Sequence, residues 1–232
     1  DRLPRQLDSQ QAQDGLDPFA KLAIELVTSA RARRAFDLDE ESSKTRERYG
    51  SHRWGQMALL ARRLVESGVT FVTLNTAPDC LRWDWHVSIT RENRPQPDPG
   101  GPNVGMEHSG PPLDRALAAL ITDLSERDSC RNVLLIVWGE FGRTPRINKT
   151  GGRDHWPPLG SVLLAGAGLR MGQIIGASSP DGGQPEDRPI GPNDVLATLY
   201  EHLGINPLQQ ALNFQGRPIP LMDDGKVIHE LF

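Results

Sequence analysis

Three short polar clusters in this sequence carry side chains that can bind a metal or an anion. They occupy residues 83–86, 139–145 and 153–157. Carboxylates and imidazoles are common ligands of divalent metals, and guanidinium groups hold oxyanions through paired donors. The residue types therefore indicate metal-dependent chemistry on an anionic group. The candidate ligands are Asp84, His86, Glu140, Asp154 and His155, and the candidate anion-binding residues are Arg143 and Arg153.

Glu140 stands where an apolar run, Val133 to Trp138, breaks off into a glycine-rich segment. A carboxylate at the end of a buried strand costs several kcal/mol unless it is paired or bound to a cation. An ion pair with Arg143 and a bound metal explain Glu140 equally well on the local residues. Gly139 and Gly142 favour a ligand, because glycine lets the backbone approach one closely.

Each of the other two clusters also has a structural alternative. Asp84 can close a turn through its own side chain while the neighbouring tryptophans pack on the body of the protein. His155 can lie in an ordinary surface loop, with Trp156 and Pro157 packing below it. Taken together, however, three such clusters near one edge of a sheet favour a functional site, because ligands collect where the strands end.

Several other kinds of site are not supported by the sequence. It contains no glycine-rich phosphate loop and no serine in a nucleophile elbow, and neither Thr144 nor Ser161 has a base partner nearby in the sequence. A metal-centred reaction is therefore favoured over a serine triad. Oxygen and nitrogen ligands without thiolate suit zinc, manganese, magnesium or calcium, and the sequence leaves the choice open.

The elements expected to position these clusters alternate between helices and strands. The helix at 54–67 has an apolar stripe and is followed by Gly68, which marks its end. The residues expected in the buried stripe are Met57, Leu60, Ala61, Leu64 and Val65. An apolar strand after a crossover helix predicts a parallel sheet covered on both faces, and so an α/β fold. The expected helices lie at 17–34, 54–67, from 112 and from 193 or 194 to 203, and the expected strands lie at 69–74, 133–138 and 162–165.

Bulk composition narrows the class of protein. The chain has 232 residues and a net charge of -4, so it has no broad basic field for a nucleic-acid backbone. No apolar stretch approaches the length of a membrane span. Two distant cysteines leave the redox compartment open. The chain begins at Asp1 rather than Met, which predicts a processed or truncated product.

The three clusters together resemble an uncharacterised bacterial family, the domain-of-unknown-function family fifteen-oh-one, which is often described as sulfatase-like. The resemblance rests on the segments Trp83-Asp84-Trp85-His86, Gly139-Glu140-Phe141-Gly142-Arg143-Thr144-Pro145 and Gly152-Arg153-Asp154-His155-Trp156-Pro157. That family looks like a distant branch of the alkaline phosphatase superfamily, whose members cleave phosphate or sulfate esters at paired metal sites.

The resemblance implies a three-layer α/β sandwich with a mostly parallel sheet, present here as a partial domain. Residues 1–50 would form a helical or extended segment, and residues 51–232 the C-terminal part of the alkaline phosphatase-like domain. Asp84 and His86 resemble one ligand set, Glu140 a second and His155 the last, while Phe141 replaces an expected histidine. The nucleophile would lie in a missing N-terminal segment, which puts activity of the isolated chain in question, and export to the periplasm is expected.

We therefore expect a metal-dependent hydrolase acting on a small anionic ester of sulfate or phosphate. The alternative is a non-catalytic binding or surface-assembly protein that keeps the fold. A third reading, a metal-dependent esterase of neutral substrates, would not need Arg143. Substrate, metal and oligomeric state are not determined by the sequence.

Overall fold

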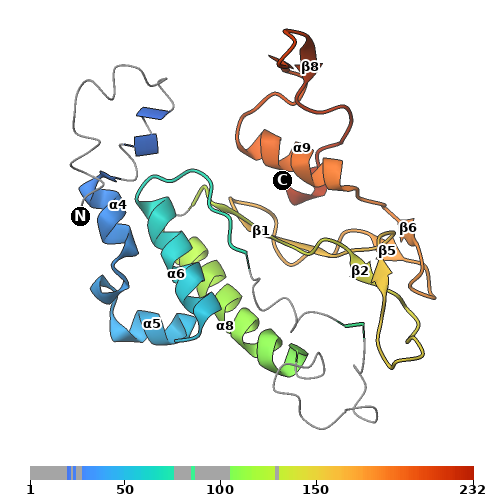
Figure 1. Ribbon diagram of the computed structural model, residues 1–232, viewed down its shortest axis with the longest axis horizontal. Helices are drawn as coiled ribbons and strands as arrows, with labels where there is room; N and C mark the ends of the chain where they lie inside the picture. Colours follow the sequence, from blue (N-terminus) through green and yellow to red (C-terminus); the bar gives the residue numbers. More distant parts are fainter. Residues whose placement is uncertain (1–19, 22, 25–27, 76–84, 87–104, 129–130) are drawn as a thin grey trace. The chain divides into compact units, whose positions relative to one another are not determined.

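The computed structural model describes residues 20–21, 23–24, 28–75, 85–86, 105–128 and 131–232. The chain divides into two compact units (Figure 1). Unit 1 comprises residues 1–77 and 110–123, and unit 2 comprises residues 78–109 and 124–232. Unit 1 is helical where it is described, whereas the described strands belong to unit 2.

Unit 1 is built from short helices that begin at polar caps. The side-chain oxygens of Ser29 and Ser42 accept hydrogen bonds from the backbone of the first turn that follows, and His52 Nδ1 does the same for Gly55. Both α4 and α5 contact α6. The elements are α4 (Ala30–Phe36), the 3-10 helix η1 (Leu38–Glu40), α5 (Ser43–Tyr49), α6 (Arg53–Glu66) and part of α8 (Gly105–Glu126).

The helix predicted at 54–67 is confirmed by α6, which ends just before Gly68 with its φ of 103°. Its buried face differs from the expected stripe. Of the expected stripe only Ala61 is buried, and Met57, Leu60, Leu64 and Val65 are partly buried. The other buried side chains are those of Trp54, Ala58, Leu59 and Arg62. The burial of Arg62 in this face was not expected, since arginine is seldom fully buried without a partner.

The other helix predictions fit less closely. The helix expected from residue 17 to 34 lies partly outside the described residues, and Ser29 caps a new helix instead of continuing the old one. The helix expected to open at Pro112 is α8, which already begins at Gly105 and contains Pro111 and Pro112.

Unit 2 contains four two-stranded antiparallel sheets among the described residues. The longest pairs β1 with β4, from Leu134 opposite Gly166 to Trp138 opposite Val162. The strands are β1 (Leu134–Trp138), β2 (Gly142–Arg143), β3 (His155–Trp156), β4 (Val162–Gly166), β5 (Ala177–Ser178), β6 (Pro185–Asp187), β7 (Gln210–Leu212) and β8 (Pro218–Pro220).

The three-layer sandwich with a mostly parallel sheet is therefore wrong for this structure. A parallel pair needs a long crossover connection, but the chain between β1 and β4 holds only the β2–β3 ladder and turns straight back. The strand expected at 69–74 is not formed, so the inferred βαβ unit does not close. The strands expected at 133–138 and 162–165 do form, as β1 and β4, with the opposite relative direction.

The core of unit 2 gathers around α9 (Pro192–His202) and the C-terminal tail. Leu169, Val195, Ile228 and Leu231 are buried together, and partly buried residues of β1 and β4 pack against them. The cap of α9 is Gly191 rather than the expected Asn193 or Asp194. Asp194 instead accepts hydrogen bonds from the backbone of Gly191 at 2.8 Å and of Lys226 at 2.7 Å, which fastens the tail to the helix start.

The short 3-10 helix η5 (His229–Leu231) is held by a second tie, the ion pair of Glu230 with Arg188. Arg188 Nε lies 2.5 Å from Glu230 Oε1, and Nη2 lies 3.1 Å from Oε2. This paired hydrogen bond lowers the pKa of Glu230 from its ordinary value of 4.5 to about 2. The carboxylate thus favours the folded state only while it is ionised.

We expect the variant Glu230→Gln to be less stable than wild type above pH 4.5, with the difference shrinking as the pH falls toward 2. The reason is that a lowered folded pKa gives stability that is present above the unfolded pKa and disappears on protonation of the folded state. Urea unfolding followed by circular dichroism at several pH values measures this. The exposed Glu186→Gln is the control, and a difference that stays constant with pH would contradict the expectation.

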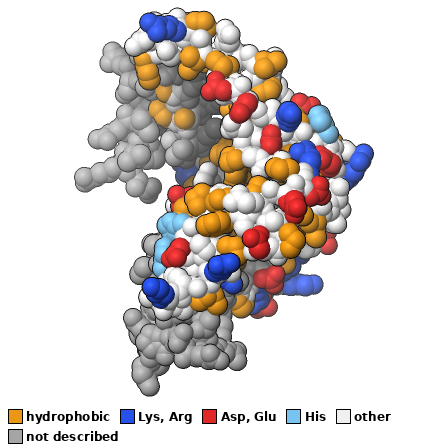
Figure 2. Space-filling model, turned by 90° about the vertical axis from the view of Figure 1, so that its right-hand side faces the viewer, with side chains coloured by type: hydrophobic (Ala, Val, Ile, Leu, Met, Phe, Trp, Pro, Cys, Tyr) orange, Lys and Arg blue, Asp and Glu red, His pale blue; other side chains and the backbone are white. Residues whose placement is uncertain are grey.

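The described surface mixes side chains of all kinds. Figure 2 shows hydrophobic, acidic and basic groups interspersed on the face that it draws. Among the described helices, none has both the length and the apolar content needed to cross a membrane.

Candidate functional site

The second and third sequence clusters meet in unit 2 through the ladder of β2 and β3. Gly142 pairs with Trp156, and Arg143 pairs directly with His155. Just beyond the ladder, the backbone N–H of Gly142 donates to the carbonyl oxygen of Leu159 at 2.6 Å. Two clusters separated in sequence therefore become one continuous surface.

The described part of the first cluster, Trp85 and His86, joins the same surface. The backbone N–H of Arg153 donates to the carbonyl oxygen of Trp85 at 2.6 Å. The rings of His86 and His155 lie with their centroids 4.5 Å apart and their planes inclined by 52°. Two imidazoles from distant parts of the sequence thus come together, as the sequence clusters led us to expect. Asp84 lies outside the described residues.

Two further side chains surround the histidine pair. The ring of Phe141 lies 4.1 Å from that of His155 between centroids. Arg143 Nη1 lies 3.5 Å from His86 Nδ1 and donates to the carbonyl oxygen of Arg153 at 3.2 Å. Because a guanidinium can only donate, this contact uses Nδ1 of His86 as an acceptor, and a metal bound beside it would take the other nitrogen.

Asn148 organises the loop that carries these groups. Its Nδ2 donates to the carbonyl oxygen of His86 and to Asp154 Oδ1, both at 2.9 Å. Its Oδ1 accepts from the backbone of Thr150 and Gly152 and from the Thr150 hydroxyl, at 2.8–3.0 Å. One amide thereby fixes the position of His86 relative to the 148–154 loop. We did not predict this role, although Asn148 stands three residues before Gly151-Gly152, and asparagine commonly closes turns through its own side chain.

The remaining predicted residues have different surroundings. Glu140 is exposed, and no ion pair between it and Arg143 is found among the described residues. Asp154 Oδ1 is engaged by Asn148, and Arg153 Nη1 donates to the carbonyl oxygens of Thr144 at 2.6 Å and Pro145 at 2.5 Å. Within the described residues, no group of three or more His, Cys, Asp or Glu side chains is placed to hold a metal.

Trp156 anchors the outer side of the ladder. Its Nε1 donates to the carbonyl oxygen of Gly183 at 2.7 Å, in the loop between β5 and β6. That loop is itself closed by Asp181, which accepts from the Ser179 hydroxyl at 2.6 Å and from the Gly183 backbone at 3.0 Å. These hydrogen bonds lower the pKa of Asp181. The residue after His155 is therefore held on a loop with its own internal closure.

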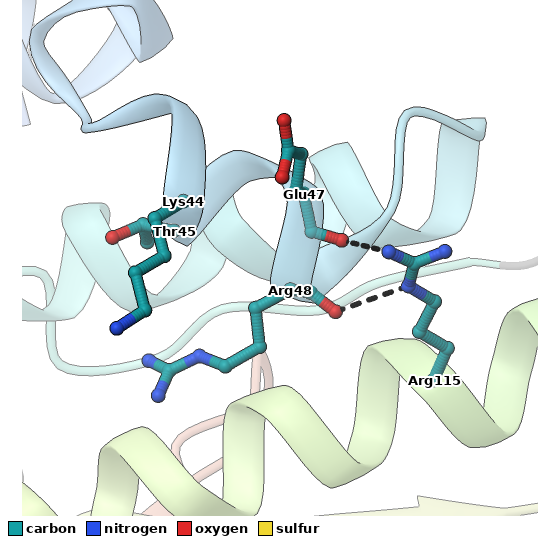
Figure 3. A pocket seen from close by; sticks show the side chains of 5 residues that line it. All are labelled: Lys44, Thr45, Glu47, Arg48 and Arg115. Carbon is teal, nitrogen blue, oxygen red and sulfur yellow. Dashed lines mark hydrogen bonds between the residues drawn. The ribbon is translucent and has the colours of Figure 1, made fainter.

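A separate hollow of about 420 Å³ lies in unit 1. It is lined by Lys44, Thr45, Glu47, Arg48 and Arg115 (Figure 3). Arg115 does not point a free guanidinium into it: Nη2 donates to the carbonyl oxygen of Glu47, and Nε donates to that of Arg48 at 3.2 Å. Those carbonyls belong to the last turn of α5, where a cation stabilises the helix end. One of the cations that line the hollow therefore has a structural role as the cap of α5.

The family model described as "Protein of unknown function (DUF1501)" matches residues 3–232. The chain belongs to this family. No match was found among curated proteins or among solved structures. The match covers the three clusters from which the resemblance was inferred, so the family expected from the sequence is confirmed. The description of this family names no activity.

Proposed function

We propose that this DUF1501 chain is a metal-dependent hydrolase of sulfate or phosphate esters. The observation that supports it most directly is the approach of His86 and His155, whose ring centroids lie 4.5 Å apart next to the guanidinium of Arg143. Two imidazoles suit a divalent metal, and a guanidinium suits the oxygens of an anionic ester. The site would thus combine metal binding with binding of the anionic group.

The donor atoms bear on which metal fits. Imidazole nitrogen is a good ligand for zinc and a poor one for calcium or magnesium, which prefer oxygen. The described residues supply His86 and His155, and Asp84, two residues before His86, would be a further ligand. We therefore favour zinc among the four metals that the sequence leaves open. When bound, such a metal would polarise an ester oxygen and offset negative charge that develops on it.

The chain's own residues would contribute binding and positioning. Arg143 would hold the anionic group through its paired N–H donors. Arg153 Nη1 donates to the carbonyl oxygens of the 144–145 turn and so stabilises the loop. Its remaining donors would face the anion. Asn148 keeps His86 in register with that loop. Glu140, exposed at the end of β1, and Asp154 would act as supporting carboxylates.

Removing either histidine should weaken zinc binding. We expect His86→Ala and His155→Ala each to lower zinc affinity by at least about tenfold, the lower end of the effect seen for groups that support a metal site. Isothermal titration with zinc and elemental analysis of the purified chain would measure it. His229→Ala, an exposed histidine of the tail, is the matched control. Full zinc content in both site variants would refute the proposal.

A panel of sulfate and phosphate esters, tested on wild type and on Arg143→Met, would examine the substrate. Loss of binding to anionic esters in this variant supports an anion-holding role. Unchanged turnover of a neutral ester by both proteins would instead favour an esterase.

One observation favours the non-catalytic alternative, a binding or surface-assembly protein. Phe141 stacks on His155 at the position where the resemblance places a metal-binding histidine. Wild-type protein that binds no zinc, with Phe141→His gaining it, would support this second candidate. Export to the periplasm stays a prediction from the family resemblance.

A further inference from the structure

The hairpin of β7 and β8, near the label β8 in Figure 1, has two edges of unequal character. Its register pairs Gln210 with Pro220, Ala211 with Ile219 and Leu212 with Pro218. Both flanks are closed by backbone hydrogen bonds, from Asn213 N–H to the Arg217 carbonyl and from Leu221 N–H to the Gln209 carbonyl, each at 2.9 Å. These two bonds determine which residue pairs of the ladder are hydrogen-bonded to each other.

Hydrogen-bonded pairs alternate with non-hydrogen-bonded pairs in an antiparallel ladder. Asn213 with Arg217 and Gln209 with Leu221 are hydrogen-bonded pairs. The hydrogen-bonded pair between them is therefore Ala211 with Ile219. The N–H and C=O groups of Gln210 and Leu212 therefore point away from β8. On the other strand the outward positions are Pro218 and Pro220, which have no N–H. The outer edge of β8 is blocked by proline, and along the outer edge of β7 no further strand is paired among the residues that the structure describes.

The side chains on this hairpin are exposed and apolar. Leu212 is 73% exposed, Leu208 78% and Ile219 47%, and Phe214 in the turn is fully exposed. An isolated two-stranded hairpin is marginal in water, and three or more strands with an apolar face are needed for independent stability. The hairpin would thus gain both hydrogen bonds and apolar burial by accepting a further strand along β7.

Charge identifies the strand that fits. Residues 203–216 contain no Asp, Glu, Lys, Arg or His, in a chain of which 24% is charged. A partner of opposite charge has nothing to recognise at this edge, whereas an identical uncharged edge meets it without repulsion. By contrast, the β5–β6 hairpin carries Glu186 and Asp187 and would repel its own copy.

We propose that β7 is the site at which two copies of this chain associate, edge to edge about a twofold axis. The axis passes beside Ala211, which faces Ala211 of the second copy. Gln210 then exchanges both backbone hydrogen bonds with Leu212 of the second copy, and Leu212 does so with Gln210. Two hairpins become one four-stranded antiparallel sheet whose outer edges are both the proline-bearing β8.

Sedimentation of the full chain over a range of concentrations tests the pairing. Wild type should show a reversible monomer–dimer equilibrium. Gln210→Pro removes an outward N–H that the hairpin itself does not use, and so deletes two interfacial hydrogen bonds per dimer. We expect it to weaken dimerisation by at least about tenfold, given the net worth of such bonds. Gln210→Ala, which keeps the N–H, is the matched control and should associate like wild type.

A second variant tests whether a local folding defect, rather than the lost hydrogen bonds, explains the result for Gln210→Pro. Leu212→Lys keeps every backbone donor but places a charge beside the twofold axis, and it should also give a monomer. Circular dichroism should be unchanged in all three variants. Monomeric wild type throughout, or a dimer that persists in both Gln210→Pro and Leu212→Lys, would overturn the proposal.

Discussion

Replacing Asp123 by alanine is expected to lower the free energy of unfolding by about 3–5 kcal/mol, as is usual when one member of a buried charge network is removed. Asp123 is 1% exposed and lies on α8, where it meets Arg62 of α6. The Tyr49 hydroxyl donates to Asp123 Oδ2 at 2.7 Å, and Arg48 Nη2 pairs with Oδ1. One carboxylate thus serves three partners inside unit 1.

The cost arises because the partners cannot recover these contacts from water. Tyr49 is completely buried, and burial together with the adjacent Asp123 carboxylate raises the pKa of its hydroxyl well above the ordinary range, so it stays a donor. Arg62 is 2% exposed. Its Nε lies 3.3 Å from Asp123 Oδ2, and its Nη2 lies 2.7 Å from Glu41 Oε1, as ion-pair contacts rather than aligned hydrogen bonds. Without Asp123, a buried guanidinium keeps only part of its compensating charge.

The rest of the network shows which partners remain. Glu41 also pairs with Arg63 at 2.6 Å, and Glu66 pairs with Arg62 Nη1 at 2.6 Å. Burial alone would raise the pKa of Glu41, but the hydrogen bond from Arg63 and the close positive charge of Arg62 outweigh it, and the pKa is lowered. Arg62 therefore keeps two carboxylates, which is why we expect Asp123→Ala to weaken the fold without abolishing it.

Urea unfolding of the variant measures the loss, and Asp39→Ala is the matched control. Asp39 is also a carboxylate paired with an arginine, Arg46, but its side chain is 88% exposed. Such a surface pair is worth at most about 1 kcal/mol. Asp123→Asn, which keeps the shape and an acceptor oxygen, should fall between the two. Equal losses for Asp123→Ala and Asp39→Ala would show that burial does not determine the energetics here.

The same network shows what the sequence does not reveal about the fold. The helix at 54–67 could be predicted because its apolar spacing is local, and the glycine that ends it is adjacent. The direction of its buried face could not be predicted, because the spacing of apolar residues alone places Arg62 on the surface. Its burial depends on Asp123, far along the chain, and long-range charge pairing leaves no periodic signal.

For the strands, the sequence predicted the position but not the direction of pairing. The apolar runs that became β1 and β4 were located correctly, but a continuous apolar run was interpreted as a strand of a parallel sheet. Here the strands pair antiparallel, and Trp138 and Leu163 remain 46% and 41% exposed. An apolar run indicates that a strand forms, whereas the strand with which it pairs, and in which direction, depends on the length of chain that connects the two. Of the residues predicted for the candidate site, His86 and His155 come together, while Asn148 was missed because most of its contacts are with the backbone.

Gly142→Ala is expected to disrupt the candidate site itself. Gly142 was first interpreted as a residue that lets a ligand approach. The structure gives a different reason: a Cβ there would lie 2.4 Å from the carbonyl oxygen of Leu159 and 3.1 Å from its carbonyl carbon. Both are backbone atoms, which cannot rotate aside. Overpacking of this kind costs about 1–3 kcal/mol or more, because the backbone must shift.

The shift would separate the two sides of the site. Gly142 lies between Phe141, which stacks on His155, and Arg143, which contacts His86. Moving β2 away from the 155–159 segment would break the hydrogen bond from Gly142 N–H to the Leu159 carbonyl and the register of Arg143 with His155. We therefore expect Gly142→Ala to lose zinc affinity as well as stability, although it removes no ligand.

Gly139→Ala and Gly160→Ala are the matched controls, because a Cβ at either position would meet its nearest neighbouring atom only at 4.0 Å. Both should unfold and bind zinc as wild type does. Thermal unfolding and zinc titration on all four proteins separate the two possible roles of the glycines. If Gly142→Ala kept the stability of the controls, the close approach to Leu159 would not constrain the site. If Gly139→Ala and Gly142→Ala lost zinc affinity but kept their stability, these two glycines would act through ligand access, as the sequence first suggested.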